Sequence, residues 1–114
     1  MRKVDVMEFE GRKGEWVVVV GKQADDSKVD VVVGQIVGQD EDTGFDVVKV
    51  EKVIKDSKYE EVELEEGDEI ELQAGWLYGF VIECKDENEA MKVGNEYKNK
   101  SDEEIVKEIE SVIR

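Results

Sequence analysis

The stretch Trp16-Val17-Val18-Val19-Val20 is apolar at five consecutive positions. A strand that faces water on one side alternates apolar and polar residues, so an unbroken apolar run indicates a β-strand buried on both faces. The run Val31-Val32-Val33-Gly34 repeats the pattern Val18-Val19-Val20-Gly21 thirteen residues later, across a polar turn at residues 21–28. Two copies are too few for a solenoid, which needs about three repeats or more, so we expect the two arms of one β-hairpin.

Further strands are predicted on both sides of this hairpin. The first spans residues 4–9, and another over residues 45–54 changes its apolar face along its length, which predicts a β-bulge or a bend. Residues 59–73 alternate apolar side chains with glutamates around a turn at residues 65–68, a pattern typical of a second hairpin. A last strand is predicted over residues 76–84.

The C-terminal residues change to a helical pattern. Asp86-Glu87-Asn88-Glu89 and Ser101-Asp102-Glu103-Glu104 both resemble capping boxes, in which the first side chain accepts a backbone hydrogen bond and the fourth reaches back. Behind the second box, Ile105, Ile109 and Val112 fall on one face of a helix. We therefore expect two helices, of which the second carries an apolar stripe.

Length and composition fit one folded domain. The chain has 114 residues, close to the common domain size, and 39% of them are hydrophobic. We expect a single α+β domain over residues 1–114, with a β-rich part at 1–84 and a helical part at 85–114. The first part should form a bent antiparallel β-sheet or a small β-barrel of about six to seven strands, followed by two C-terminal helices.

The residue types that most enzymes need are scarce. The chain has no His and a single Cys, Cys84, and it lacks the glycine-rich loops that cradle phosphates. Without His there is no imidazole base and no His-based zinc site. Glu83 and Asp86 lie near Cys84 in sequence and disfavour its thiolate form. We therefore expect a protein that is not an enzyme and has no cofactor.

Charge and hydropathy limit the partners and the location. Asp and Glu total 31 against 16 Lys and Arg, which gives a formal net charge of -15 and argues against direct contact with nucleic acid. No segment reaches the roughly 20 apolar residues that span a membrane, and the first residues do not resemble a signal peptide. A lone Cys fits a reducing compartment. We expect a cytoplasmic protein without a membrane partner, and the oligomeric state stays open.

The negative charge is concentrated in one part of the chain. Residues 59–83 contain nine acids and no Lys or Arg, and on the expected hairpin the glutamates share one face of the sheet. Such a surface would attract a basic protein partner, including one that normally binds nucleic acid, for which this chain would act as an inhibitor or nucleic-acid mimic. The alternative is a solvated face that keeps the protein soluble. The candidate partner-binding residues are Glu61, Glu63, Glu65, Glu66, Asp68, Glu69 and Glu71.

Two other functions remain open. Trp76, Tyr78 and Phe80 alternate along the last predicted strand, so they would share one face and line the pocket of a small-molecule-binding β-barrel. The competing interpretation is that these aromatic residues belong to the core. A structural or assembly subunit is the other alternative, in which the helix at residues 105–113 docks on another chain.

An acidic turn is the only metal candidate in the sequence. Asp40, Asp42 and Asp46 place carboxylates at spaced positions, a pattern that hard cations use. The pattern departs from a calcium loop, because Phe45 stands where that loop has an invariant Gly and the flanking residues predict strands rather than helices. The simpler interpretation is a turn between two strands, and we expect no metal.

Overall fold

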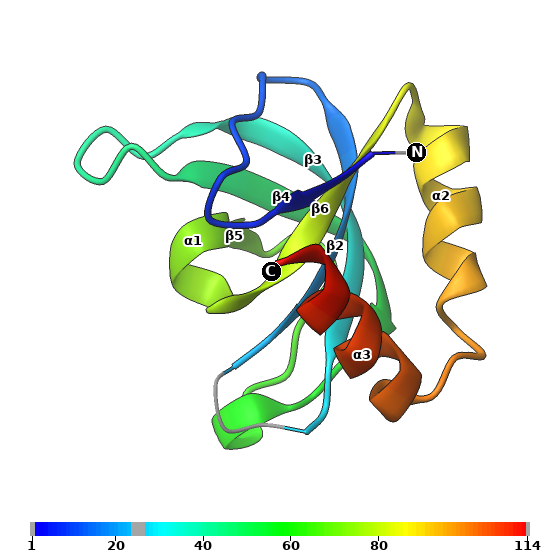
Figure 1. Cartoon of the computed structure of the whole chain (residues 1–114). Coiled ribbons are helices and arrows are strands. Elements are labelled where there is room, and N and C mark those ends of the chain that lie inside the picture. The colour runs from blue at the N-terminus through cyan, green and yellow to red at the C-terminus, as the bar shows by residue number, and fades with distance from the viewer. Residues whose placement is uncertain (1, 24–26, 114) are drawn as a thin grey trace.

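One antiparallel sheet followed by two helices accounts for most of the chain (Figure 1). The computed structural model describes residues 2–23 and 27–113. The strands are β1 (Lys3–Asp5), β2 (Trp16–Lys22), β3 (Asp30–Gln39), β4 (Asp46–Lys55), β5 (Glu69–Glu71) and β6 (Tyr78–Cys84). The helical elements are η1 (Tyr59–Glu61), α1 (Leu72–Gly75), α2 (Glu87–Glu96) and α3 (Asp102–Val112). The sheet order is β1-β6-β2-β3-β4-β5, which confirms the predicted α+β fold with six strands.

The two valine runs pair with each other as the arms of a hairpin. Val18 lies opposite Val33 and Val20 lies opposite Val31 across the β2–β3 ladder. The hairpin is central in the sheet, because β6 pairs with the free side of β2 and β4 pairs with the free side of β3. Residues 17–20 are fully buried, as expected for a strand that is covered on both faces.

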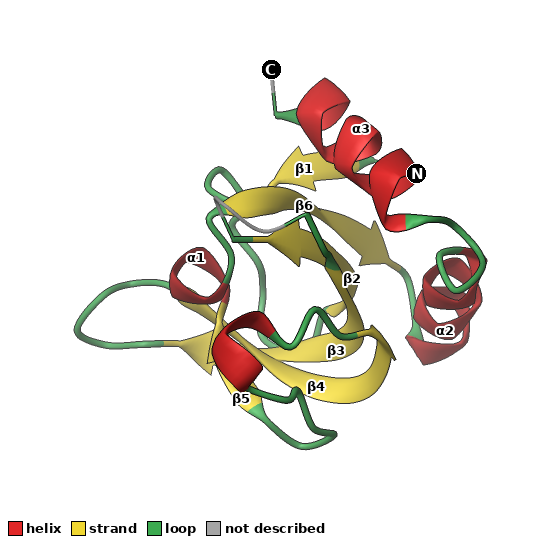
Figure 2. Cartoon of the chain, turned by 90° about the horizontal axis from the view of Figure 1, so that it is seen from below, coloured by secondary structure: helices red, strands yellow, loops and turns green. Residues whose placement is uncertain are grey.

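Two hydrophobic cores cover the two faces of the sheet. The first lies between the sheet and the helices α2 and α3, and the second lies on the inner side of the bent sheet, where α1 is found (Figure 2). Alternate valines of β2 enter the two cores. The first core contains Val18, Val20, Val29, Val31, Val33, Phe80, Ile82, Cys84, Ala90, Val93, Tyr97, Ile105 and Ile109. The second contains Val6, Phe9, Val17, Val19, Val32, Ile36, Val48, Val50, Leu72, Trp76 and Val81.

The sheet bends but does not close into a barrel. The β3–β4 register shifts at three places, which confirms the irregular pairing predicted from the change of apolar face in β4. The edge strands β1 and β5 have three residues each and do not pair with one another. Gln73 of α1 instead links the turn after β1 to the start of β4. Its Nε2 donates to the carbonyl oxygen of Val6 (2.9 Å), and its Oε1 accepts from the backbone N of Asp46 (3.2 Å).

The prediction of a second hairpin over residues 59–73 was wrong. Within that range only residues 69–71 form a strand, and this strand, β5, pairs with β4 rather than with residues 61–65. The predicted turn is present, since the backbone N of Asp68 donates to the carbonyl oxygen of Glu65 (3.1 Å). The turn therefore joins a non-strand segment to an edge strand.

Local backbone geometry explains why the first arm is not extended. Lys58, Glu60 and Glu61 adopt positive φ, which interrupts a strand. The carboxylate of Asp56 accepts hydrogen bonds from the backbone N of Lys58 (2.9 Å) and of Leu64 (3.0 Å), so it takes the place of a partner strand. An extended arm would also set its glutamates beside those of β5, where like charges repel.

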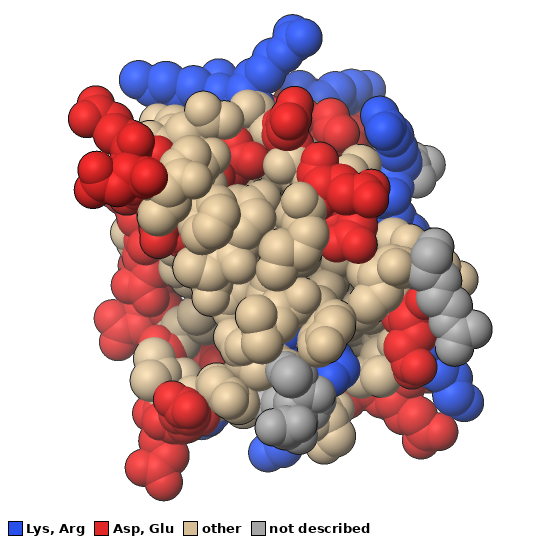
Figure 3. Space-filling view, turned by 60° about the vertical axis from the view of Figure 1, so that its left-hand side comes forward, with Lys and Arg blue, Asp and Glu red and all other residues tan. Residues whose placement is uncertain are grey.

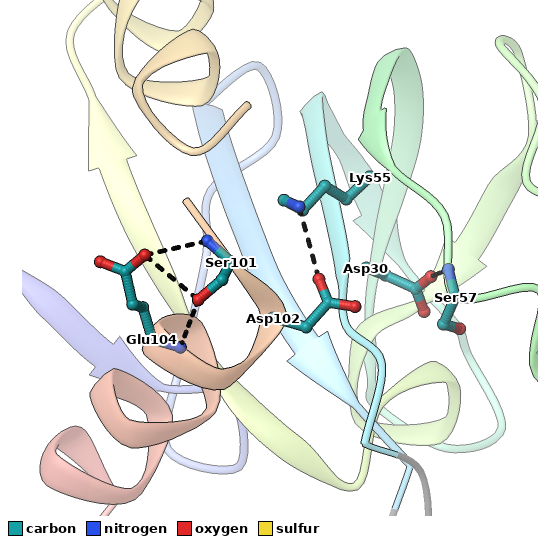
Figure 4. Close-up of polar contacts among 6 residues, drawn as sticks. All are labelled: Asp30, Lys55, Ser57, Ser101, Asp102 and Glu104. Atoms are coloured by element: carbon teal, nitrogen blue, oxygen red, sulfur yellow. Dashed lines mark hydrogen bonds and ion pairs between the residues drawn. The ribbon is translucent and has the colours of Figure 1, made fainter. Parts of the chain in front are cut away.

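Both predicted helix starts are present. Ser101 Oγ accepts from the backbone N of Glu104 (3.1 Å), and Glu104 Oε1 accepts from the backbone N of Ser101 (3.1 Å), which completes a capping box at α3 (Figure 4). At α2, the Asp86 carboxylate accepts from the backbone N of Glu89 (2.8 Å). The Glu89 carboxylate reaches one residue further back than predicted, to the backbone N of Lys85 (3.0 Å).

We expect Gly79→Ala to destabilise the fold strongly. Gly79 lies opposite Gly21 in the β2–β6 ladder, and a Cβ there would collide with the carbonyl oxygen of Val20, which is backbone and has little freedom to move. The free energy of unfolding should fall by about 2–3 kcal/mol. Gly14→Ala is the matched control, because its Cβ would enter open space and only its positive φ of 94° is unfavourable, at about 1 kcal/mol. Equal losses in urea unfolding would contradict the close approach of the two strands.

Candidate functional site

Residues 59–71, here called the acidic segment, lie at one edge of the sheet. The segment has eight acids and no Lys or Arg, and it runs from η1 through a connection to β5. Most of its carboxylates are exposed, whereas Asp68 and Glu71 are half-buried. The seven candidate residues therefore lie on η1, a connection and an edge strand instead of on two paired strands.

Ion pairs leave the charge of this segment largely intact. Of the five ion pairs among the described residues, four join a Lys to an acid of α3. They are Lys3–Glu108 (2.8 Å), Lys55–Asp102 (3.4 Å; Figure 4), Lys100–Glu108 (3.9 Å) and Lys107–Glu103 (3.5 Å). In the fifth pair, Lys58–Glu63 (3.6 Å), both side chains are exposed to solvent, and such pairs contribute little to stability. Lys49 lies opposite Glu69 across the β4–β5 ladder without forming an ion pair with it.

Hydrogen bonds hold the acidic segment in place. In addition to the Asp56 bonds, the carboxylate of Asp68 accepts from the backbone N of Glu65 (2.9 Å), and Glu71 accepts from Thr43 Oγ1 (3.0 Å). The apolar side chains of Leu64 and Ile70 pack against the second core. The carboxylates are therefore presented from an anchored backbone, which lowers the entropy that a partner must remove on binding.

A pocket of about 320 Å³ lies between the acidic segment and α1. Its walls combine apolar side chains with carboxylates. The lining residues are Gln23, Asp30, Asp56, Ser57, Tyr59, Glu60, Val62, Leu64, Ile70, Ala74, Gly75 and Trp76. Three of these described residues are acids, and none of them is a Lys or Arg.

Asp30 is a buried acid that sequence reasoning missed. It is 7% exposed, and its carboxylate accepts from the backbone N of Ser57 (2.7 Å; Figure 4) and from Nε1 of Trp76 (2.9 Å). Burial raises the pKa of Asp30 above its ordinary value of 3.8, against the lowering effect of these hydrogen bonds, and the like charge of Asp56 adds to the rise. The signal in the sequence was an isolated acid between Val29 and Val31.

Glycine provides the space that brings Trp76 to this acid. A Cβ on Gly21 would lie 2.7 Å from Cγ of Trp76, so only Gly permits the indole to pack directly on β2. The indole is 2% exposed, and its N–H satisfies the buried carboxylate of Asp30 at the start of β3. The packing of one ring therefore fixes the floor of the pocket.

The three aromatic candidates do not share one pocket. Trp76 precedes β6 and lies in the second core, while Phe80 lies in the first core on the opposite face of the sheet. Tyr78 is 44% exposed and borders a different hollow, where Lys22 Nζ lies 5.6 Å from the centre of its ring. The strand alternation begins only at Tyr78, because α1 ends just before Trp76.

The acidic turn before β4 is held by its own hydrogen bonds. Asp40 Oδ1 accepts from the backbone N of Asp42 (2.8 Å) and of Thr43 (3.0 Å), and these bonds hold the pKa of Asp40 below its usual range. Asp46 is buried and accepts from Gly11 N and Gln39 Nε2 (both 3.3 Å). Across residues 2–23 and 27–113, no group of three or more His, Cys, Asp or Glu could hold a metal ion.

The face of the molecule that carries α1 has an uncharged centre. Figure 3 shows acidic side chains on both sides of this area and Lys and Arg along its upper edge. Two large side chains of the acidic segment, Tyr59 (38% exposed) and Val62 (64% exposed), line the pocket and remain open to solvent. Exposed apolar side chains surrounded by charge are typical of protein interaction sites.

Known proteins provide no guide to this site. The chain matches no family model, no curated protein and no solved structure significantly. Within the part of the chain that the structure describes, no helix is both long and apolar enough to cross a membrane. The geometry and charge of the described residues are therefore the basis for assigning a function.

Replacing Asp30 by Asn should lower the free energy of unfolding by about 1–3 kcal/mol, because the amide NH₂ would face a donor and one hydrogen bond would be lost. The raised pKa adds a pH dependence. As pH rises from 3.8 towards the pKa in the fold, the unfolded chain releases the Asp30 proton first, so the wild-type fold loses stability. Asn does not titrate.

The difference in unfolding free energy between wild type and Asp30→Asn should therefore be larger near pH 4 than near pH 7. Urea unfolding of both proteins at the two pH values measures it. A difference that is constant or grows with pH would show that burial does not raise the pKa of Asp30.

Proposed function

We propose that this chain is a cytoplasmic, non-enzymatic interaction protein that binds a basic protein partner through the acidic segment. The observation that carries the proposal is the separation of charge: the acids of α3 take four of the five ion pairs among residues 2–23 and 27–113, and of the acids at residues 59–71 only Glu63 has one, with exposed Lys58. A partner that normally binds nucleic acid has the required basic surface, and for such a partner this chain would be an inhibitor or a nucleic-acid mimic.

Charge and apolar contact would have separate roles in this association. Unneutralised carboxylates attract a cationic surface over about a Debye length and orient it before contact. Tyr59 and Val62 then supply apolar area to the centre of the contact, where large side chains contribute most of the affinity. Edge position favours access, because the segment is not covered by another strand on its outer side.

Binding to a labelled peptide rich in Lys and Arg tests the proposal by fluorescence anisotropy. Affinity should fall steeply between about 50 mM and about 500 mM salt. A variant with four substitutions, the fourfold Glu→Gln variant, should bind about tenfold more weakly at low salt, since each exposed charge contributes tenths of a kcal/mol. Its substitutions are Glu61→Gln, Glu65→Gln, Glu66→Gln and Glu69→Gln.

The matched control changes four exposed acids outside the segment and alters the net charge equally. It carries Glu8→Gln, Glu87→Gln, Glu96→Gln and Glu110→Gln. Its affinity should stay within about twofold of wild type, because these acids lie on other elements and are screened from the segment. Equal weakening by the two variants would show that overall charge, and not this surface, attracts the peptide.

A further inference from the structure

The pocket beside the acidic segment has three carboxylates and no described cation. Asp30 lies at its floor, and Asp56 and Glu60 lie in its walls. The pocket and the acidic segment share residues, because Tyr59, Glu60, Val62, Leu64 and Ile70 belong to both. A polypeptide held along the segment would therefore pass over the mouth of the pocket.

The Asp30 carboxylate can accept further hydrogen bonds from a cation. Burial of a charge is unfavourable unless the charge is paired, and the partners of Asp30 are hydrogen-bond donors without formal charge, Ser57 N and Trp76 Nε1. Each carboxylate oxygen has two lone-pair sites, so the bonds from Ser57 N to Oδ1 and from Trp76 Nε1 to Oδ2 leave further capacity. A cation would compensate both Asp30 and its neighbour Asp56.

The shape and polarity of the pocket indicate which kind of cation fits it. The apolar side chains Val62, Leu64 and Ile70 line the walls, which suits a long methylene stem with a charged head. A volume of about 320 Å³ is at the lower end of ligand pockets, so the pocket has room for one large side chain but not for a large ligand. A guanidinium binds carboxylates with two parallel hydrogen bonds and stacks on aromatic rings such as Tyr59, which an ammonium does less well.

We propose that this pocket receives one arginine side chain of the basic partner, with the guanidinium at Asp30 and Asp56 and the stem along Val62 and Leu64. This inference rests on the proposed function, because the acidic segment is what brings the partner to the mouth. It adds a specific contact to an attraction that charge alone would leave unspecific.

NMR titration of isotope-labelled wild-type protein with three capped peptides tests whether the pocket receives an arginine side chain. The first has one Arg flanked by lysines, the second has citrulline in place of that Arg, and the third keeps the Arg but has citrulline in place of one flanking Lys. The second and third have equal charge. The Arg peptide should bind about tenfold or more tightly than the second and within about twofold of the third.

The reporters are the indole N–H of Trp76 and the backbone N–H of Ser57, both of which donate to Asp30. Their signals should move with the first and third peptides and not with the second. Trp16→Phe identifies which indole signal belongs to Trp76, since the chain has two Trp residues. Ala74→Phe, at an exposed position that lines the pocket, should abolish these shifts and give the second and third peptides equal affinity.

Equal affinity for the second and third peptides, with no shift at Trp76, would overturn the pocket inference. It would leave the proposed function intact if the fourfold Glu→Gln variant still weakened all three peptides. Absence of any binding would overturn both. A capped single arginine that bound as tightly as the first peptide would also overturn the inference, because the pocket would then serve a small molecule rather than a protein partner.

Discussion

The fold depends on burying one β-hairpin on both of its faces. Residues 17–20 of β2 and 31–33 of β3 project apolar side chains alternately to the two sides of the sheet, so covering one side leaves the other exposed. Helices α2 and α3 cover one side, and the sheet bends so that β4, α1 and the turn after β1 cover the other. Each buried Val contributes roughly 1.5–3 kcal/mol, far more than a surface ion pair.

The same bend determines where the pocket lies. Because the sheet curves over the second core without closing, one end of that core is not covered by a strand. Other segments of the chain cover it instead. At this end Gly21 and Gly79 face each other without side chains, and Trp76 packs on Gly21 and meets Asp30. The acidic segment forms the remaining wall. A buried acid and a charged rim thus occur together because of packing, without any sequence motif.

Local patterns predicted the elements whose causes are local. The valine hairpin, the irregular β4, the capping box of α3 and the Asp86 cap of α2 follow from neighbouring residues, and all were confirmed. The predicted hairpin at residues 59–73 was wrong. The alternating sequence of its first arm resembles a strand, but hydrogen bonds to the Asp56 carboxylate hold that backbone in a non-extended conformation. The acids of the candidate site were found by counting charges. The pocket could not be predicted from the sequence, because it depends on a contact between Trp76 and Asp30, which are 46 positions apart.

The distribution of Lys residues is the argument for proposing a binding surface rather than a merely solubilising one. Solubility requires only scattered charge, whereas adjacent acids without cations repel one another and reduce stability. Lys3 joins β1 to α3 and Lys55 joins β4 to α3, so these cations pair with acids of the last helix rather than with the acidic segment. In the acidic segment only Glu63 has an ion pair among the described residues, so an external cation, as proposed, would relieve the remaining repulsion. Asp30 is a buried acid whose hydrogen-bond donors, Ser57 N and Trp76 Nε1, carry no formal charge, so the proposed basic partner would complement both the surface and its pocket.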